Sequence, residues 1–400
     1  MSKESEAVIL SAARTAIGKF QGGLSSIPAV KLGAVAVKVA VERAGIDSND
    51  IEEVLMGNVV QAGSGQAPAR QSAIFAGLPA IVGATTVNKV CGSGLKAVML
   101  SVQAIRAGDA NLFVAGGMES MSRVPYLVNG RSGELKFGNQ MLTDALLNDG
   151  LWDPFENWGM GNAAEFIADE YEVTRDAMDE FALRSHLKAV AAEEAGRFKL
   201  EIVPVQISGR KGEVTLFDID EGPRKDTSLE SLAKLKPSFK ADGKVTAGNS
   251  SSMNDGAAAV VVSSLGYAKK NNLKPVAHIV GYAQAAVEPK YLFSAPAFAI
   301  PKLLKKIDWK LSDVDLFEIN EAFAAQVLAN GYALADQGWD WDKVNVNGGA
   351  IALGHPLGAS GARVLTSLIY ALKDRGLKRG VVSICLGGGE AVAMAIEVES

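Results

Sequence analysis

The two ends of this chain repeat one order of expected helices and strands. Near the N-terminus, a helix ending at Ala44 leads through a connection that contains Asp50 to a strand at residues 53–56. Near the C-terminus, a helix at residues 299–306 leads through a connection that contains Asp313 to a strand at 316–319. Asp50 and Asp313 match at an offset of 263 positions. This repeat of alternating elements predicts a duplicated α/β fold.

Hydrophobic periodicity predicts further elements around this repeat. In the first half we expect strands at residues 8–13, 84–87 and 112–115 and helices at 30–44, 68–76 and 94–107. The middle of the chain breaks the pattern, and a strand at 257–263 returns to the core. We therefore divide the chain into a first half (1–121 plus 250–273), an inserted loop domain (122–249) and a second half (274–400).

The only two cysteines both stand in glycine-rich segments. Cys91 lies in the sequence VCGSG and Cys385 in ICLGGG, and we expect both segments to be turns. Flanking glycines allow a backbone to approach a ligand closely. A buried cysteine that packs as a small hydrophobe is the structural alternative for either residue. The shared setting favours a two-thiol active site.

His355 has the setting expected of a base that serves a thiol nucleophile. It follows a glycine-rich stretch that starts at residue 347, whereas His186 falls in an expected helix at 176–197 and His278 in an expected strand at 276–280. Cys91 and His355 are 264 positions apart, close to the offset of the repeat. We expect each at the N-terminal end of a central helix, where free N–H groups and the helix dipole favour a thiolate or an oxyanion.

Composition excludes several classes of function. The 400 residues are 48% hydrophobic and carry a net charge of -5, which argues against bulk nucleic-acid binding. Two distant cysteines form neither a disulfide framework nor a metal-ligand set, and free thiols fit the cytoplasm. No apolar run approaches the length of a membrane helix. The first expected strand starts so early that we expect no signal peptide before it.

Five segments resemble the signatures of the thiolase family, in the same order along the whole chain. They are VNKVCGSG at residues 87–94, GGMESMS at 116–122, NEAF at 320–323, the stretch from Asn347 to Gly361, and CLGGG at 385–389. The resemblance implies a duplicated fold with α-β-α-β-α layers. It also implies acyl transfer between coenzyme A thioesters, with no permanently bound cofactor and no metal.

The resemblance also implies roles for five residues. Cys91 is the nucleophile that carries the acyl group, His355 activates it, and Cys385 removes a proton from a second acetyl-CoA. The backbone N–H groups of Cys91 and Gly387 serve one oxyanion, while His355 and a water held by Asn320 serve the enolate. A helix N-cap is the alternative interpretation of Asn320. In the reverse reaction, the same groups would cleave a 3-ketoacyl-CoA.

Contacts to coenzyme A and to the acyl group are implied in the same way. Arg224, Ser231, Ala247 and Ser251 match family positions that contact the nucleotide and pantetheine, and Met160 and Phe323 match the walls of the acyl pocket. Basic residues of the loop domain are further candidates for holding phosphates, although a solvated charged face is as good an interpretation; they are Arg210, Lys211, Arg224, Lys225, Lys234 and Lys236.

Two departures from the family pattern bear on chain length. Acetyl-specific members usually have a histidine where this chain has Gly159, and many bacterial members have a glycine where it has Phe293. A small pocket near Phe293 and Phe323 favours short 3-ketoacyl-CoA substrates.

We keep three alternatives open: a long-chain 3-ketoacyl-CoA thiolase of β-oxidation, a decarboxylating ketoacyl synthase, and a non-catalytic acyl-CoA-binding scaffold. A ketoacyl synthase usually pairs its cysteine with two histidines or with a histidine and an asparagine, and no second histidine lies in a glycine-rich turn here. A scaffold would be expected to lose Cys91 or Cys385, and both are present. Family members are dimers or tetramers, so a homodimer or homotetramer is expected.

Overall fold

The computed structural model describes residues 3–399 except 129, 132, 134–136 and 210–211. Within these residues the main sheet has 11 strands, nine of which follow the order β15-β16-β17-β14-β1-β13-β5-β3-β4. The strands of its first half are β1 (Ala7–Thr15), β3 (Glu53–Gly57), β4 (Gly83–Val87), β5 (Leu112–Ser120) and β13 (Asn254–Ser264). Those of its second half are β14 (Ala277–Ala286), β15 (Leu316–Ile319), β16 (Arg379–Leu386) and β17 (Glu390–Glu397). Two short strands, β2 (Gly18–Lys19) and β10 (Ile202–Val203), pair with β13 and β1.

The two halves of the sheet have the same topology. In the first, β3 and β5 are parallel, and β13 runs antiparallel between β5 and β1. In the second, β15 and β16 are parallel, and β17 runs antiparallel between β16 and β14. The halves join where β1 pairs antiparallel with β14. The predicted duplication is confirmed, and the strands expected near residues 8, 53, 84, 112, 257 and 316 are all present.

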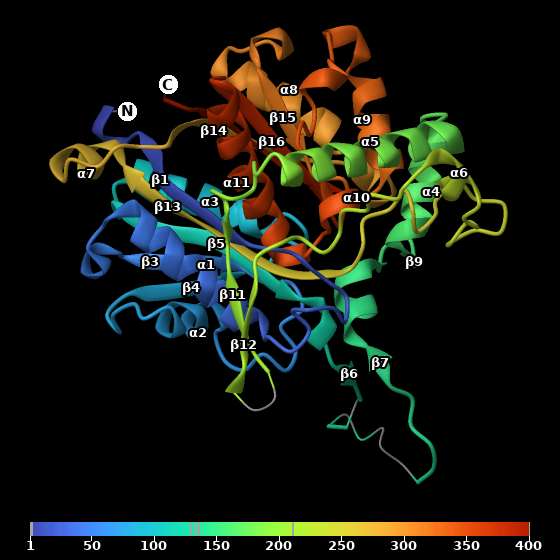
Figure 1. Cartoon of the computed structure of the whole chain (residues 1–400), viewed down its shortest axis with the longest axis horizontal. Helices are drawn as coiled ribbons and strands as arrows, with labels where there is room; N and C mark the ends of the chain where they lie inside the picture. The colour runs from blue at the N-terminus through green and yellow to red at the C-terminus, as the bar shows by residue number, and fades with distance from the viewer. Residues whose placement is uncertain (1–2, 129, 132, 134–136, 210–211, 400) are drawn as a thin grey trace.

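Helices form three layers around the two halves of the sheet (Figure 1). Helices α3 (Ser93–Ala107) and α11 (Leu357–Arg375) pack together in the middle, in a core shared with strands of both halves. Helices α1 (Ala29–Ala44) and α2 (Pro68–Phe75) cover the outer face of the first half. Helices α8 (Pro296–Ile307) and α9 (Ala324–Ala333) cover the outer face of the second. This is the α-β-α-β-α arrangement expected from the resemblance.

The central helices start at matching positions in the two halves. Helix α3 begins at Ser93 and α11 at Leu357, an offset of 264 residues. Each ends at a glycine in the left-handed conformation, Gly108 with φ 86° and Gly376 with φ 62°, where a side chain would be strained. The repeat in the sequence therefore specifies the two helices that meet at the centre of the molecule.

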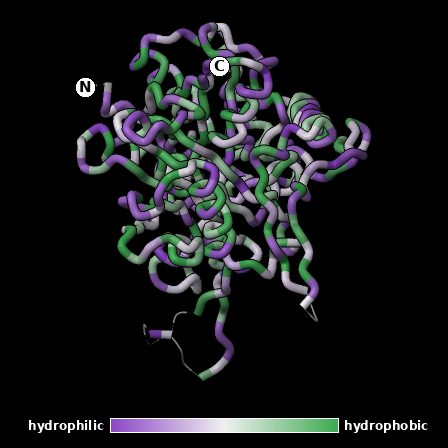
Figure 2. The backbone as a smooth tube through the Cα atoms, turned by 60° about the vertical axis from the view of Figure 1, so that its left-hand side comes forward, coloured by the Kyte–Doolittle hydropathy of each residue, from purple (hydrophilic) through white to green (hydrophobic). Residues whose placement is uncertain are grey.

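The segment between β5 and β13 leaves the sheet and returns beside its point of departure, because these strands are neighbours. It contains α4 (Met160–Glu170), α5 (Arg175–Glu194) and α6 (Leu229–Ala233). Its short strands pair as β6 (Tyr126–Leu127) with β7 (Thr143–Asp144), β8 (Trp152–Asp153) with β9 (Trp158–Gly159), and β11 (Val205–Ser208) with β12 (Val214–Phe217). The expected helix to residue 197 ends at Glu194. The pairs β6–β7 and β11–β12 project from the body, as Figures 1 and 2 show.

A short helix, α7 (Leu265–Lys270), follows β13, and another, α10 (Ala350–Leu353), precedes α11. Among the described residues no helix combines the length and the apolar character needed to cross a membrane.

Candidate active site

Cys91 lies two residues before α3 at the centre of the molecule. It is half-buried, and the backbone N–H groups of Cys91 itself and of Gly387 favour the charged form of its thiol. The preceding residue, Val90, has a φ of 45°, a left-handed conformation that is strained for a β-branched side chain. Such strain, at a cost of about 1–3 kcal/mol, persists only where the surrounding structure fixes the backbone. The turn before α3 is therefore held to present Cys91.

Glycines let the first turns of the two central helices touch. A Cβ on Gly94 would lie 2.8 Å from the backbone nitrogen of Ala362 and 2.9 Å from the carbonyl oxygen of Gly358, closer than real Cβ atoms come. Cys91 also packs against the hydrophobic cluster that contains Leu357, the first residue of α11. The glycines of both motifs thus bring the turn of Cys91 against the start of α11.

His355 lies two residues before α11, the place that Cys91 occupies before α3. Its backbone N–H donates to Oδ1 of Asn254 (2.9 Å), and its Nδ1 lies 2.6 Å from Oγ of Ser360. Burial, with a further contribution from the charge of Arg363, lowers the pKa of His355 to about 3. The ring is therefore neutral at physiological pH and can accept a proton.

Asn320 lies directly after β15, with its side chain fully buried beside the ring of His355. Its Nδ2 is 3.5 Å from Nδ1 of His355, and its Oδ1 accepts from Arg363 (3.4 Å). The alternative interpretation of Asn320 as a helix cap is wrong, because α9 starts at Ala324 and its N-cap is Phe323.

Cys385 differs from its expected setting. It is the seventh residue of β16 and not part of the following turn, and it is 2% exposed. Its apolar neighbours belong to a cluster that includes Leu292, Phe293 and Phe323. The glycines that follow it form the β16–β17 turn instead, where Gly388 and Gly389 have φ values of 84° and 86°. The prediction of a turn at Cys385 was wrong because the strand continues to the edge of the glycine run.

Both thiols have raised pKa values in the resting protein. Burial raises the pKa of Cys91 to about 12, outweighing the two N–H donors, and the charge of Glu119 adds to the rise. Burial, followed by the charge of Cys91, raises the pKa of Cys385 well above its ordinary value. The expectation that the helix end favours a resting thiolate is therefore not met. Both cysteines hold their protons, and a charge on Cys91 disfavours ionisation of Cys385.

Glu119, from the GGMESMS segment, ties the two halves together at this site. Its carboxylate accepts hydrogen bonds from the backbone N–H groups of Val59 (2.9 Å) and Gly358 (2.8 Å) and from Nδ2 of Asn58 (2.7 Å). Burial raises its pKa to about 7, although these donors favour the charged form. Glu119 thereby fixes the first turn of α11.

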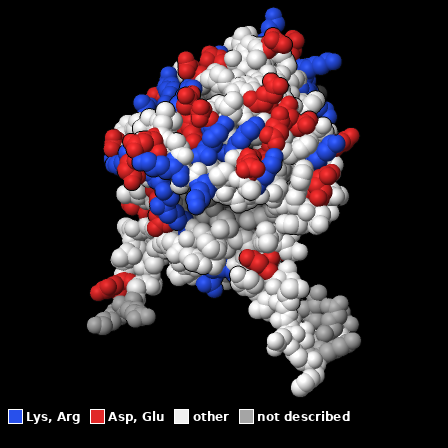
Figure 3. Space-filling view, turned by 90° about the vertical axis from the view of Figure 1, so that its right-hand side faces the viewer, with Lys and Arg blue, Asp and Glu red and all other residues white. Residues whose placement is uncertain are grey.

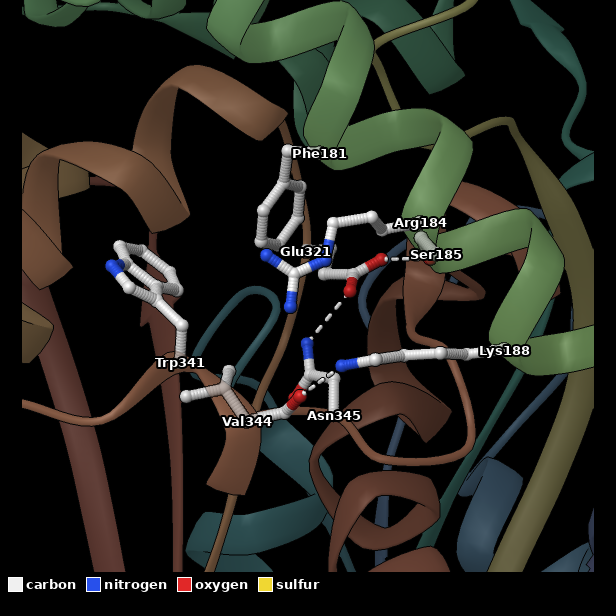
Figure 4. Close-up of a pocket in the computed structure, with 8 residues that line it drawn as sticks. All are labelled: Phe181, Arg184, Ser185, Lys188, Glu321, Trp341, Val344 and Asn345. Atoms are coloured by element: carbon white, nitrogen blue, oxygen red, sulfur yellow. Dashed lines mark hydrogen bonds between the residues drawn. The ribbon is translucent and has the colours of Figure 1, made fainter. Parts of the chain in front are cut away.

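Glu321 is a second buried carboxylate, next to Asn320. It accepts hydrogen bonds from Ser185 on α5 (2.6 Å) and from Asn345 (2.7 Å), as the close-up shows (Figure 4). Burial raises its pKa. The small pocket drawn there lies beside the site and contains neither cysteine. Glu321 therefore joins α5 to the segments that contain Asn320 and Asn345.

The expected coenzyme A contacts lie in the loop domain and just after it. Arg224, Ser231 and Ala247 are exposed, and Ser251 is half-buried. The hydroxyl of Ser231 donates to the carbonyl of Ser228 (2.8 Å) and that of Ser251 to the carbonyl of Ala322 (2.9 Å). These residues surround no single described cavity, so their role rests on their match to the family pattern.

The expected acyl-pocket residues do lie together. Phe323 and Phe293 meet edge to face with ring centroids 5.3 Å apart, in the cluster that contains Cys385, and Met160 packs against that cluster. Gly159, at the N-cap of α4, has a φ of -79° that any residue can adopt, and a Cβ there would meet no atom closer than 3.5 Å. The backbone therefore does not require a glycine at that position.

The basic residues of the loop domain include several with acidic partners. Nζ of Lys225 lies 3.0 Å from Glu194 and that of Lys234 lies 2.6 Å from Glu230. Figure 3 shows Lys and Arg side chains among Asp and Glu on the side of the molecule that carries α4 and α6. Arg210 and Lys211 lie outside the described residues. The solvated-face interpretation fits Lys225 and Lys234.

The other two histidines have structural contacts, as expected. His278 on β14 lies 2.8 Å from carboxylates of both Glu6 and Glu399. His186 on α5 accepts the backbone N–H of Arg224 through Nδ1 (3.2 Å), and burial lowers its pKa to about 4. His186 therefore anchors the segment that carries a candidate coenzyme A contact.

Comparison with known proteins identifies the family. The model of the thiolase N-terminal domain matches residues 7–265 and that of the thiolase C-terminal domain matches residues 273–398. The chain belongs to the thiolase family. Acetyl-CoA acetyltransferases of Cupriavidus necator and Pseudomonas aeruginosa are 53% and 52% identical to it, each match covering 98% of this chain and 99% of the relative. The crystal structure of the Bacillus anthracis acetyl-CoA acetyltransferase superposes with a TM-score of 0.95 at 43% identity, covering 98% of this chain and 99% of that one.

Several residues of this thiolase site were not singled out from the sequence. Glu119, Asn254, Ser360 and Arg363 each contact His355, Asn320 or the start of α11. Glu119 and Ser360 stand in two of the five family signatures, so a search for polar residues within those signatures could have found them. Asn254 opens a buried strand and Arg363 follows the signature that ends at Gly361, and both look like ordinary residues of a strand and a helix.

Proposed function

We propose that this thiolase is an acetyl-CoA C-acetyltransferase. It condenses two molecules of acetyl-CoA to acetoacetyl-CoA and coenzyme A, and it catalyses the reverse thiolysis. The observation that carries the proposal is the place of Cys91, which packs against the start of the helix that His355 precedes and whose charged form two backbone N–H groups favour. Relatives about half identical over nearly the whole chain bear this name.

In the first half-reaction the proton of the Cys91 thiol passes to Nε2 of His355 while sulfur attacks the thioester carbonyl. The N–H groups of Cys91 and Gly387 stabilise the oxyanion, and one such donor contributes about 10²–10³ in rate. Collapse of the tetrahedral intermediate breaks the bond to coenzyme A. The departing thiolate takes the proton of Cys385 and leaves as a thiol, so a Cys385 thiolate and a His355 imidazolium remain.

In the second half-reaction the Cys385 thiolate takes a proton from the methyl group of a second acetyl-CoA. The enolate oxygen accepts hydrogen bonds from His355 Nε2–H and from a water held by Asn320. Its carbon attacks the acyl carbonyl on Cys91, and the carbon–sulfur bond breaks. Cys91 then recovers the proton from His355, which returns all three groups to their resting state.

The raised pKa of Cys91 makes a base necessary for the first step. A Cys91 pKa of about 12 leaves almost no thiolate at neutral pH, so a base that moves the proton during attack is required. His355, which is neutral and precedes the helix that Cys91 packs against, is the base in this proposal.

A short acyl chain is favoured by the packing around Cys385. Phe293 is 3% exposed and Phe323 is 9% exposed in the cluster that contains this thiol. A longer chain would need the space that the two rings fill. The alternative, a long-chain 3-ketoacyl-CoA thiolase, is favoured by Gly159, which leaves room at the start of α4.

Coenzyme A thioesters are the substrates in this proposal. Arg224, Ser231, Ala247 and Ser251 contact the nucleotide and pantetheine, and Met160 and Phe323 line the acyl pocket. The proposed division into two halves and a loop domain (122–249) assigns these contacts mainly to the loop domain.

We also propose a homodimer or homotetramer in the cytoplasm. Exposed apolar side chains on the β6–β7 arm, Tyr126, Met141 and Leu142 among them, support contacts between subunits. The free thiols of Cys91 and Cys385 support a reducing compartment.

Steady-state thiolysis of 3-ketoacyl-CoA substrates of increasing chain length tests the proposal. We expect kcat/KM to be highest for acetoacetyl-CoA and to fall with each added pair of methylenes. A flat or rising profile would reject the short-chain assignment and favour the long-chain alternative. Absence of both thiolysis and condensation would favour the non-catalytic scaffold.

A further inference from the structure

Ser360 is a buried hydroxyl with two partners at the start of α11. It is 0% exposed, its Oγ lies 2.6 Å from Nδ1 of His355, and the same Oγ lies 2.9 Å from the carbonyl oxygen of Pro356. The two proposed half-reactions give Ser360 no role.

The two contacts together favour one placement of the protons. A carbonyl oxygen only accepts, so the 2.9 Å contact of Ser360 Oγ with Pro356 is a hydrogen bond when the hydroxyl proton is directed at that carbonyl, which also accepts the backbone N–H groups of Ala359 and Ser360. The lone pairs of Oγ then accept from His355, which places the ring proton on Nδ1. Asn320 Nδ2, at 3.5 Å, is at the limit of a hydrogen bond to the same nitrogen, so the 2.6 Å contact decides the tautomer.

The other ring nitrogen is left with its lone pair. In a neutral imidazole with a proton on Nδ1, Nε2 is the acceptor. His355 Nε2 is buried, and it has no hydrogen-bond partner within the described part of the chain. An unpartnered buried nitrogen is costly unless a ligand or a reacting group meets it.

We propose that Ser360 is a positioning residue that holds His355 in the tautomer with the proton on Nδ1, which leaves Nε2 free to accept a proton. The step it serves rests on the proposed function: the S–H bond of Cys91 breaks, Nε2 gains the proton, and sulfur bonds to the acyl carbon. The resulting imidazolium keeps its Nδ1–H bond to Ser360 and presents Nε2–H to the substrate oxygen. In the opposite tautomer Nε2 already carries a proton and cannot act as the base.

The chain offers a close control for this role. Thr366, also on α11 and 0% exposed, donates its hydroxyl to the carbonyl four residues earlier, Ala362, at 2.9 Å. Its hydroxyl thus repeats the bond of Ser360 to Pro356 at a later turn of the same helix. Thr366→Val removes this hydroxyl at nearly constant volume, and Ser360→Thr keeps the hydroxyl at position 360.

Nitrogen NMR of full-length enzyme with ¹⁵N-labelled histidine tests the proposal directly, because the chain has only three histidines. In the parent we expect one histidine, identified by its loss in His355→Ala, to show a protonated Nδ1 and an unprotonated Nε2. Ser360→Ala should lose this single tautomer, and Thr366→Val should keep it. A parent His355 with its proton on Nε2 would overturn the proposal.

Kinetics give the second readout. In Ser360→Ala, single-turnover acetylation by acetyl-CoA should slow by about 10- to 100-fold, which is part of the 10²–10⁴ in rate that general-base catalysis supplies. The acetyl-CoA concentration that gives the half-maximal rate should change little. Thr366→Val should stay near the parent, and Ser360→Thr, if folded as judged by its melting temperature, should recover most of the rate. If Ser360→Ala keeps both the tautomer and the parental rate, Ser360 does not position the ring. If instead His355→Ala acetylates normally, the proposed function fails, while the NMR result for Ser360 still stands.

Discussion

The two thiols of this thiolase lie in contrasting surroundings. Cys91 stands half-buried in a strained turn before a helix, where two backbone N–H groups favour the charged form of its thiol. Cys385 lies within a strand, among the apolar side chains that include Phe293 and Phe323. Two backbone N–H groups favour the charged form of Cys91, whereas burial and the charge of Cys91 disfavour the charged form of Cys385 against one backbone N–H group. The contrast supports our proposal that Cys91 is the nucleophile and Cys385 the base.

Substitution of each thiol by a hydroxyl gives the largest expected effect. Cys91→Ser should lose both acetylation and condensation, because a hydroxyl is a far poorer nucleophile near neutrality. Cys385→Ser should still be acetylated at close to the parental rate, yet lose about 10²–10⁴ in condensation, the usual contribution of a general base. Single-turnover acetylation and steady-state condensation measure the two steps. Parental condensation by Cys385→Ser would contradict the two-thiol mechanism.

Removal of the shared base should weaken both steps. His355→Ala leaves the Cys91 proton without an acceptor and the enolate without a donor, so acetylation and condensation should each fall by about 10²–10⁴. His278→Ala is the control, because the ring of His278 on β14 contacts Glu6 and Glu399. This variant should keep both activities. Equal activities of the two variants would remove His355 from the mechanism.

A smaller effect is expected from the apolar side chains around Cys385, which limit the length of the acyl chain in our proposal. With Phe293→Gly, the ratio of kcat/KM values should shift from acetoacetyl-CoA toward the longer 3-ketohexanoyl-CoA, because each methylene that finds room gains about 0.8 kcal/mol. Loss of a buried ring also costs about 3–5 kcal/mol of stability. Phe317→Ala, in the separate cluster under α8 and α9, controls for that cost and should leave the ratio unchanged. A ratio unchanged in Phe293→Gly would mean that this ring does not bound the pocket.

The smallest effect concerns stability in acid. The pKa of His355 is about 3 in the folded protein against an ordinary 6.5, so the unfolded chain binds more protons between these values. This histidine therefore contributes stability that is present above pH 6.5 and is lost as the pH falls toward 3. His355→Gln should flatten the fall of the urea midpoint over that range, and His278→Gln should not flatten it. Identical slopes in the parent and His355→Gln would contradict a buried neutral ring.

Much of this fold could be predicted from the sequence, because periodicity and a repeat carry local information. The matching starts of α3 and α11 reproduce the offset between Cys91 and His355. The sequence placed Cys385 in a turn, because a strand that leads into glycines does not show at which residue its pairing with the next strand ends. The raised thiol pKa values were also missed, since burial depends on packing between distant segments.

The polar contacts of the site escaped prediction for the same reason. Glu119 reaches Gly358 across 239 positions, and Asn254 reaches His355 across 101. Such contacts arise only when β5, β13 and α11 meet in the folded core, and no spacing along the chain predicts them.

Mass spectrometry of the acetylated enzyme tests the separate roles of the two thiols most directly. Cys385→Ser is mixed with acetyl-CoA, quenched in acid, digested and mapped, and the parent is treated in parallel. Because condensation is blocked in the variant, we expect one acetyl group per chain to accumulate on Cys91. An acetyl group on Cys385 of the parent with none on Cys91, or no adduct in either protein, would contradict the account.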